Sequence, residues 1–301
     1  MLYPLTVTTS ISYDELIERE ARHWSAVESD PHTPQLWDNE ALFEVFFGKE
    51  RRDLIQRAAA SGPRVLELGC GNGNLARKLA ERGLRVEGID LSSERIASAT
   101  DSCADLPSDQ RPTFRVGDLN TIELGREQFD TVIAYGSLHH ILRLDHLLDQ
   151  VHRTLRPSGR FLVYDYVGMS VFPKLVAATL YALLPTYKPY SEKWKLRRRL
   201  ASFLASEKQK RAAMSEGKTS LLHEGSPFEE ISGRSIPVEI RNRFRVLDEQ
   251  SSNPFWFYLA AKVRMPKVVR LPVARFLHAL DNLLLAIGFS GTFVFVDATK
   301  P

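Results

Sequence analysis

Cysteine is scarce in this sequence, with Cys70 and Cys103 the only two among 301 residues. Two thiols cannot supply the several cross-links of a disulfide framework, and they are too few for a cysteine-rich zinc site. Charge of one sign is also missing, because the formal net charge is only +3. So small an excess gives no reason to expect a nucleic-acid partner.

Long hydrophobic runs are absent as well. No window reaches the roughly 18 uninterrupted apolar residues of a membrane span. The first ten residues, MLYPLTVTTS, lack the basic start and the apolar core of a signal peptide. These absences predict a cytoplasmic protein. The remaining composition, 44% hydrophobic and 26% charged, is that of a globular chain with room for one large domain or two small ones.

The stretch Val65–Gly73, which reads VLELGCGNG, is the most informative part of the sequence. Its apolar start suits a buried parallel strand, and the three alternating glycines allow a sharp turn that a ligand can approach closely. The residues from Asn74 to Ala80 then read as a helix, whose first N–H groups are free. Glu67 stands out, because a carboxylate on a buried strand is costly unless a cation or hydrogen-bond donor meets it.

Short apolar runs alternate with helical segments from residue 64 to about residue 167, a pattern that predicts a doubly wound parallel sheet. Ligands of such sheets bind at the carboxyl ends of the strands. Helices are expected near Leu75–Arg82, Ser93–Thr100 and Asp145–Leu155. The expected strands are Val65–Leu68, Val86–Ile89, Thr113–Val116, Thr131–Ala134 and Phe161–Tyr164.

The frame Glu67-x-Gly69-x-Gly71-x-Gly73 resembles the first motif of the class I S-adenosylmethionine-dependent methyltransferases. The resemblance implies S-adenosyl-L-methionine as cofactor and S-adenosyl-L-homocysteine as product. It also implies that Glu67 lies near the sulfonium and amino end, while the glycines and Asn72 lie under the amino-acid and ribose parts. The loop also matches the loose dinucleotide pattern as GNGNLA. A pyrophosphate, however, would gain nothing from Glu67.

Two acidic residues follow the next two expected strands. Asp90, with Leu91 after it, can accept both ribose hydroxyls; a simpler role at the start of the next helix is also open, although Ser92 already suits that N-cap. By the same resemblance, Asp118 hydrogen-bonds the adenine amino group and the backbone of Leu119 meets the ring. A plain Gly-Asp turn is the alternative.

Residues 129–141, FDTVIAYGSLHHI, resemble the methyltransferase strand that ends in a loop carrying paired histidines. The resemblance places this loop, from Tyr135 onward, beside the sulfonium, with the histidines toward the acceptor. A hydroxyl acceptor must lose a proton as it attacks, and histidine suits that near neutral pH. We expect His140 to be the base, with His139 as the alternative and Asp165 orienting one of them.

A metal site is not expected from the sequence. His139, His140, His146 and His152 lack the i, i+4 spacing of helical ligand pairs, and no cysteine joins them.

The flanking segments are expected to cover the active site. Residues 1–62 form a helical cap, 63–168 the cofactor-binding core and 169–242 a helical lid. Residues 243–301 return to the core as strands, with a helical insertion at about 250–290. Aromatic residues of the cap could line the acceptor site or merely pack the helices: Tyr13, His23, Trp24 and Trp37.

The basic segment 193–211 is either a solvated helix face or a peripheral contact with anionic lipid. The apolar insertion could bind an apolar acceptor, pack into the core or form a homodimer interface.

The expected fold is therefore α/β, a Rossmann-like seven-stranded sheet with an antiparallel last strand, N-terminal helices and helical C-terminal insertions. The expected function is methyl transfer to a small molecule, at a hydroxyl, in secondary-metabolite, sugar or quinone-type biosynthesis. Two alternatives stay open. One is a methyltransferase that acts on a lipid-linked glycan or isoprenoid at a membrane surface. The other is a non-catalytic S-adenosylmethionine-binding sensor or assembly partner.

Overall fold

The computed structural model describes residues 12–27, 39–186, 189–193, 205–215 and 226–301. Within these residues the chain forms one seven-stranded sheet with the order β3-β2-β1-β4-β5-β7-β6. The order reverses direction between β1 and β4, and it is at such a switch point that ligands of open α/β sheets bind. The Rossmann-like fold expected from the sequence is confirmed.

Strands β1 to β5 pair in parallel, and the central strands β1 and β4 are mostly buried. Strands β1 to β4 match their expected positions within two residues, whereas β5 begins earlier than expected. Their bounds are β1 Arg64–Leu68, β2 Arg85–Asp90, β3 Thr113–Val116, β4 Phe129–Tyr135 and β5 Leu155–Tyr166.

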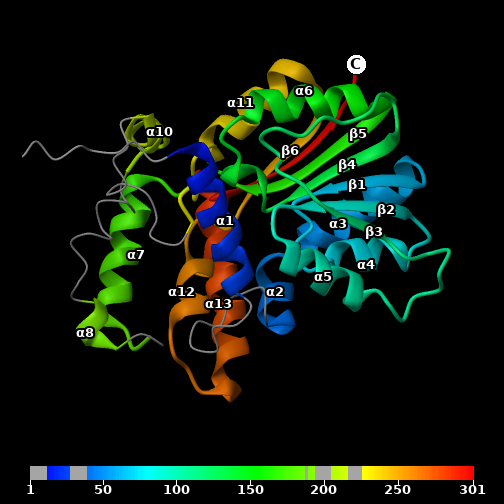
Figure 1. Ribbon diagram of the computed structural model, residues 1–301. Helices are drawn as coiled ribbons and strands as arrows, with labels where there is room; N and C mark the ends of the chain where they lie inside the picture. Colours follow the sequence, from blue (N-terminus) through cyan, green and yellow to red (C-terminus); the bar gives the residue numbers. More distant parts are fainter. Residues whose placement is uncertain (1–11, 28–38, 187–188, 194–204, 216–225) are drawn as a thin grey trace, which may run out of the picture.

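Helices cover both faces of this sheet (Figure 1). One face packs against α3 (Gly48–Ser61), α4 (Asn74–Ala80) and α5 (Ser93–Ser102), and the other against α6 (Leu144–Thr154) and α11 (Ile236–Arg243). The two apolar layers bury side chains on both sides of the sheet, which is why its strands read as continuous apolar runs.

The last strand runs opposite to its neighbours. Strand β7 (Phe293–Thr299) lies between β5 and β6 (Arg245–Ser252) and pairs antiparallel with both. The insertion of the final strand is as expected. Strand β5 is longer than expected, because it begins at Leu155 rather than at Phe161. Its pairing with β4 shifts register between Phe129 and Thr131.

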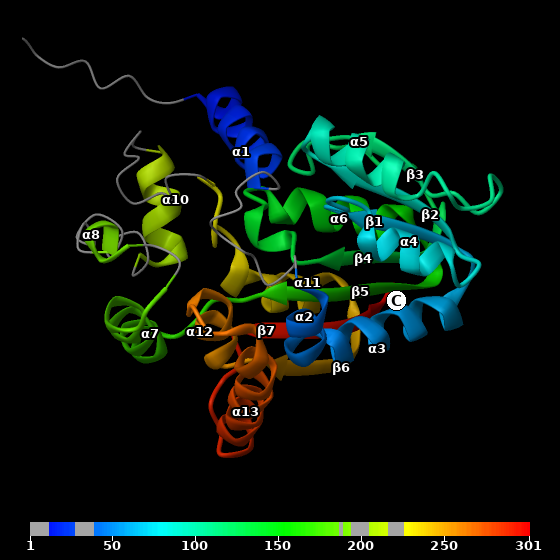
Figure 2. The same ribbon diagram turned by 90° about the horizontal axis from the view of Figure 1, so that it is seen from below.

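The remaining helices gather beyond the carboxyl ends of the parallel strands (Figures 1 and 2). A single residue, Phe47, separates the end of α2 from the start of α3. In the described residues, no helix has the length and apolarity needed to cross a bilayer. The bounds are α1 Tyr13–Val27, α2 Glu40–Phe46, α7 Val171–Leu183, α8 Tyr190–Lys193, α10 Glu207–Ser215, α12 Trp256–Lys262 and α13 Lys267–Ala286, with short 3-10 turns η2 Leu138–His140 and η4 Gly233–Ser235.

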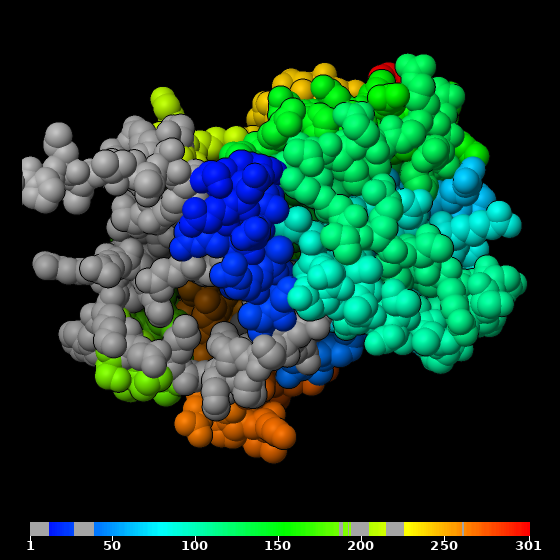
Figure 3. Space-filling view, viewed as in Figure 1, coloured from blue at the N-terminus to red at the C-terminus, as the bar shows by residue number. Residues whose placement is uncertain are grey.

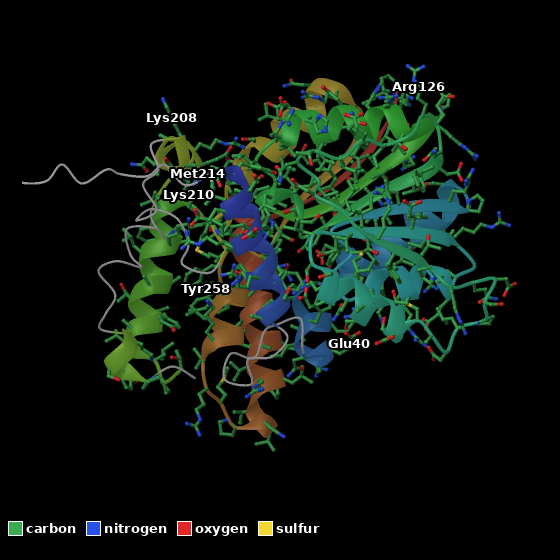
Figure 4. The ribbon with its side chains drawn as sticks, viewed as in Figure 1. Glu40, Arg126, Lys208, Lys210, Met214 and Tyr258 are labelled. Carbon is green, nitrogen blue, oxygen red and sulfur yellow. The ribbon has the colours of Figure 1, made fainter. Side chains whose placement is uncertain are left out.

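The basic segment 193–211 is not a uniform solvated face in its described part. Lys193 Nζ donates to the carbonyl of Leu184 at 2.6 Å, and Lys210 Nζ donates to the carbonyl of Glu229 at 2.9 Å; both lysines are buried. Lys208 remains exposed on α10 (Figure 4). These inward contacts weaken the expectation of a lipid-binding surface here; residues 194–204 lie outside the described part.

Candidate active site

The turn between β1 and α4 is built from glycines with left-handed backbone. Gly69, Gly71 and Gly73 have φ of 71°, 52° and 78°, values that disfavour other residues. A Cβ on Gly69 would collide with the side chain of Ser137, so this glycine lets the β4 loop approach β1. The turn therefore brings two strand ends together at the switch point.

Glu67 lies on β1 just before this turn. Its side chain is buried, with the residue 3% exposed, and its Oε2 has no hydrogen-bond partner among the described residues. Burial, together with the nearby charge of Asp90, raises the pKa of Glu67 to about 8. A buried carboxylate without a partner is costly, so this position fits a cationic ligand and would gain from one.

Asp90, at the end of β2, ties the two turns together. Its carboxylate accepts hydrogen bonds from the backbone N–H groups of Gly71 at 2.9 Å and Ser92 at 3.0 Å. Ser92 also caps α5, as expected, through the N–H of Arg95. Asp90 is thus fixed beside the glycine turn, and Leu91 follows it at the start of that loop.

Asp118 follows β3 and faces the N-terminal helix. Its Oδ2 accepts a hydrogen bond of 2.6 Å from the hydroxyl of Tyr13, and its Oδ1 accepts one from the N–H of Asn120. Burial and the neighbouring Asp118 carboxylate raise the pKa of Tyr13. Leu119 buries its side chain in the core, which leaves its backbone at the loop.

Asp165 orients His139, not the expected base His140. It is fully buried near the end of β5, and its Oδ1 lies 2.6 Å from His139 Nδ1. Its Oδ2 accepts the N–H groups of Ser137 and Leu138. With both oxygens occupied, Asp165 fixes the loop and the ring of His139 together.

His140 pairs with other carboxylates. Its Nδ1 lies 3.1 Å from Glu20 Oε1, and its Nε2 lies 3.8 Å from Glu229 Oε2. Burial alone would lower the pKa of His140, but Glu229, Glu20 and Asp165 raise it to about 9. In the form described, His140 therefore retains its proton near neutral pH and is poorly suited to act as a base.

The aromatic residues of the N-terminal cap that were expected to line the acceptor site do not all lie in one place. Helix α1 contacts the loop after β4 through Glu20 and Trp24, which meet His140. It also lies beside α5, at the surface of the molecule (Figure 3). The ring of Trp24 meets that of His140 edge-on, with centroids 5.0 Å apart, while His23 packs against Trp24. Trp37 lies outside the described residues. Tyr135 packs its ring against Tyr164, 5.3 Å away, and its hydroxyl has no partner among the described residues.

Sequence reasoning missed Glu20 and Glu229. Glu20 offered a weak signal, because it lies four residues after buried Leu16, on the inward stripe of an amphipathic helix. Glu229 offered none, since it belongs to an irregular segment about ninety residues beyond the histidines. Buried Glu20 and half-buried Glu229 thus complete a polar cluster around His139 and His140.

Part of the chain is similar in sequence to known proteins. A family model described as a methyltransferase domain matches residues 65–159. The 27-O-demethylrifamycin SV methyltransferase of Amycolatopsis mediterranei is 34% identical over 108 residues, which are 36% of this chain and 40% of that protein. The S-adenosyl-L-methionine-dependent Diels-Alderase iccD of Talaromyces variabilis is 30% identical over 137 residues, which are 44% of this chain and 47% of that protein.

The chain thus matches less than half the length of either curated relative. One similar solved structure is the geranyl diphosphate C-methyltransferase of Streptomyces coelicolor A3(2), crystallised with Mg²⁺, geranyl diphosphate and S-adenosyl-L-homocysteine. The structural match extends over a larger share of this chain than the sequence matches do. That structure superposes with a TM-score of 0.53 at 15% identity and covers 95% of this chain and 98% of that one. At that identity the likeness concerns the fold.

Proposed function

The chain belongs to the class I S-adenosylmethionine-dependent methyltransferase family, and we propose that it transfers the methyl group of S-adenosyl-L-methionine to a small molecule. The observation that carries the proposal is Glu67, a buried acidic residue at the switch point of the sheet whose Oε2 has no hydrogen-bond partner among the described residues. A sulfonium or ammonium group beside it would supply the missing positive charge.

The cofactor would lie along the strand ends, with its methionine part over Gly69–Gly73, including Asn72. Asp90 and Leu91 would meet the ribose, and Asp118 with Leu119 the adenine. The carboxylate of Asp90 already accepts hydrogen bonds from two backbone N–H groups. The ribose hydroxyls would therefore donate to oxygens that also accept these backbone bonds. Tyr13 would be displaced from Asp118, or would share it, when adenine binds.

We further propose a hydroxyl acceptor on the side of His139 and His140. The methyl group is already activated on sulfur, so the protein mainly aligns the acceptor and helps it lose a proton. The cluster can help in two ways: a ring nitrogen can take the proton, or a bound cation can acidify the hydroxyl. Trp24 and Tyr13, on the helix that covers the loop, would face the acceptor, and His23 would lie behind Trp24.

Calorimetric titration with S-adenosyl-L-methionine, S-adenosyl-L-homocysteine and NADH tests the cofactor. Binding of the first two and not of NADH is the expected result. Transfer of a radiolabelled methyl group to hydroxylated small molecules then tests the reaction. Absence of S-adenosyl-L-methionine binding, or binding of NADH in its place, would refute the proposal.

A second candidate acceptor is lipid-linked and reached at a membrane surface. Helix α13 and the residue after it expose large apolar side chains, including Val268 at 83% and Ile287 at 64%. The helix also carries Lys267, Arg270 and Arg275, whereas its acid, Asp281, is buried. An apolar face bordered by positive charge favours anionic lipid. Sedimentation with phosphatidylglycerol vesicles, but not with phosphatidylcholine vesicles, would support this candidate.

A further inference from the structure

Three ligand atoms converge beside the β4 loop. His139, His140 and Glu229 each offer one nitrogen or oxygen, and all three atoms lie within 4.8 Å of one another. We infer that His139 Nε2, His140 Nε2 and the carboxylate of Glu229 bind one divalent transition-metal ion, for which Zn²⁺ is the best match. The inference adds a site that neither the family nor the proposed reaction requires.

The outward nitrogens of both rings fit this role because their inner nitrogens are already held. His139 Nδ1 pairs with Asp165 at 2.6 Å, and His140 Nδ1 pairs with Glu20 at 3.1 Å. With Nδ1 held by a carboxylate, Nε2 is the nitrogen of each ring that is left to bind the metal, and the proton on His140 Nε2 leaves as the ion binds. Metal-bound histidines are usually supported in this way by a carboxylate behind the ring.

His140 Nε2 supplies an independent observation. It is buried and has no hydrogen-bond partner among the described residues, although it points toward Glu229, whose Oε2 lies 3.8 Å away. An unsatisfied polar atom of this kind costs about 1–3 kcal/mol. A metal ion between the two groups would give that nitrogen its partner.

The three ligand atoms would have to move only slightly closer together to bind a zinc ion. Ligand atoms about 2.0–2.2 Å from a tetrahedral zinc lie roughly 3.3–3.6 Å from one another, somewhat closer than the separations in this cluster. The backbone already holds the three residues together, because the N–H of Ile231 donates to the carbonyl of His139 at 3.0 Å. Lys210 Nζ fixes the carbonyl of Glu229 at 2.9 Å. Glu229 is therefore held near the two histidines before any metal binds.

The donor set selects the metal. Two imidazole nitrogens and one carboxylate oxygen suit Zn²⁺ better than Mg²⁺ or Ca²⁺, which prefer oxygen ligands. Three protein ligands leave a fourth position open, as in catalytic zinc sites. The role of this fourth position rests on the proposed function: an acceptor hydroxyl would bind there and lose its proton more readily. The histidines would then act as ligands instead of bases.

Zinc binding to the full chain tests the site without turnover. Protein freed of metal with a chelator is titrated with ZnCl₂ by calorimetry, and the zinc retained after dialysis is measured by mass spectrometry. We expect about one Zn²⁺ per chain, as for a single three-ligand site. His139→Ala and Glu229→Gln should each abolish retention. Glu239→Gln should retain it, because Glu239 pairs with Arg243 on the surface of α11.

Variants behind the ligands provide a graded readout. Glu20→Gln removes the carboxylate behind His140 and should weaken Zn²⁺ affinity about 10- to 100-fold. Cobalt substitution should give the strong visible absorption of a four-coordinate ion, and the absorption should be lost in Glu229→Gln. Thermal melting and binding of S-adenosyl-L-methionine show which variants are folded.

Two results would overturn the inference. One is no stoichiometric zinc in the wild-type chain, and the other is equal zinc in folded His139→Ala, Glu229→Gln and Glu239→Gln. Binding of S-adenosyl-L-methionine is measured separately in the presence of chelator. A chain that binds cofactor but not zinc therefore refutes the metal site alone, whereas one that binds zinc but not cofactor refutes the proposed function alone.

Discussion

Glu67 shows how a single residue can serve function at the expense of stability. Burial and Asp90 raise its pKa to about 8, so the folded protein binds a proton that the unfolded chain has already released above pH 4.5. Stability of the cofactor-free protein therefore falls as pH rises from about 4.5 to about 8, with a slope of about 1.4 kcal/mol per pH unit for one proton. A cation beside Glu67 would remove this penalty.

Glu67→Gln should accordingly have opposite effects on stability and binding. The free protein should be stabilised by up to about 3 kcal/mol at neutral pH, since glutamine is neutral and needs no proton uptake when the chain folds. Affinity for S-adenosyl-L-methionine should fall about 10- to 100-fold, the value of one hydrogen bond to a charged group. Urea unfolding and calorimetry measure the two quantities. Unchanged affinity would remove Glu67 from the cofactor site.

His139→Ala separates an enzyme from a cofactor-binding sensor. As base or as ligand, His139 acts on the acceptor, so its loss should lower turnover at least about 100-fold. Binding of S-adenosyl-L-methionine should change little. His146→Ala is the matched control, because His146 merely bonds the carbonyl of Ile122 at 2.9 Å. Full methyl transfer by His139→Ala, measured with radiolabelled cofactor, would exclude the assigned role.

At the scale of elements, α1 is attached to the site by one buried side chain. Glu20 accepts hydrogen bonds from Trp24 Nε1, from Ser226 Oγ and from the N–H of Phe228, and it also pairs with His140. A helix near the beginning of the chain is thereby joined to a segment some two hundred residues later. The cap over the loop thus depends on polar contacts that are closed to water.

Glu20→Ala should destabilise the fold by about 3–5 kcal/mol, because it leaves several buried donors without an acceptor. The comparison is Glu18→Ala, two residues earlier on the same helix but exposed, which should cost less than about 0.5 kcal/mol. Urea unfolding followed by tryptophan fluorescence gives both values. Equal effects of the two substitutions would show that Glu20 does not fasten α1.

The elements themselves were largely predictable from the sequence, and the acceptor side was not. Strand, turn and helix signals around Glu67 are local, so they could be read from neighbouring residues. The cluster at His139 is assembled from residues 20, 139, 140, 165 and 229. No periodicity relates positions so far apart. The choice between His139 and His140 depended on the direction of Asp165, which only the folded sheet determines.

At the scale of the whole molecule, one buried carboxylate connects the two ends of the fold. Asp297 on β7 is fully buried and receives Arg57 of α3 at 2.7 Å and Arg160 of β5 at 2.5 Å. Arg57 also reaches Asp248 on β6 at 2.6 Å. Strand β7 is thus bound to elements from the first and middle parts of the sequence.

Asp297→Asn should therefore cost about 1–3 kcal/mol, because a fully buried carboxylate that accepts from two half-buried arginines becomes a neutral amide. Asp248→Asn is the control; this aspartate is partly exposed, and Arg57 would keep its bond to Asp297, so the cost should stay near 0–1 kcal/mol. Urea unfolding is followed both by tryptophan fluorescence and by circular dichroism. If β7 completes a single cooperative unit, the two signals should shift together in Asp297→Asn. Separate transitions would show that the C-terminal strands unfold independently of the parallel sheet, and an unshifted midpoint would show that the arginine pairs contribute little.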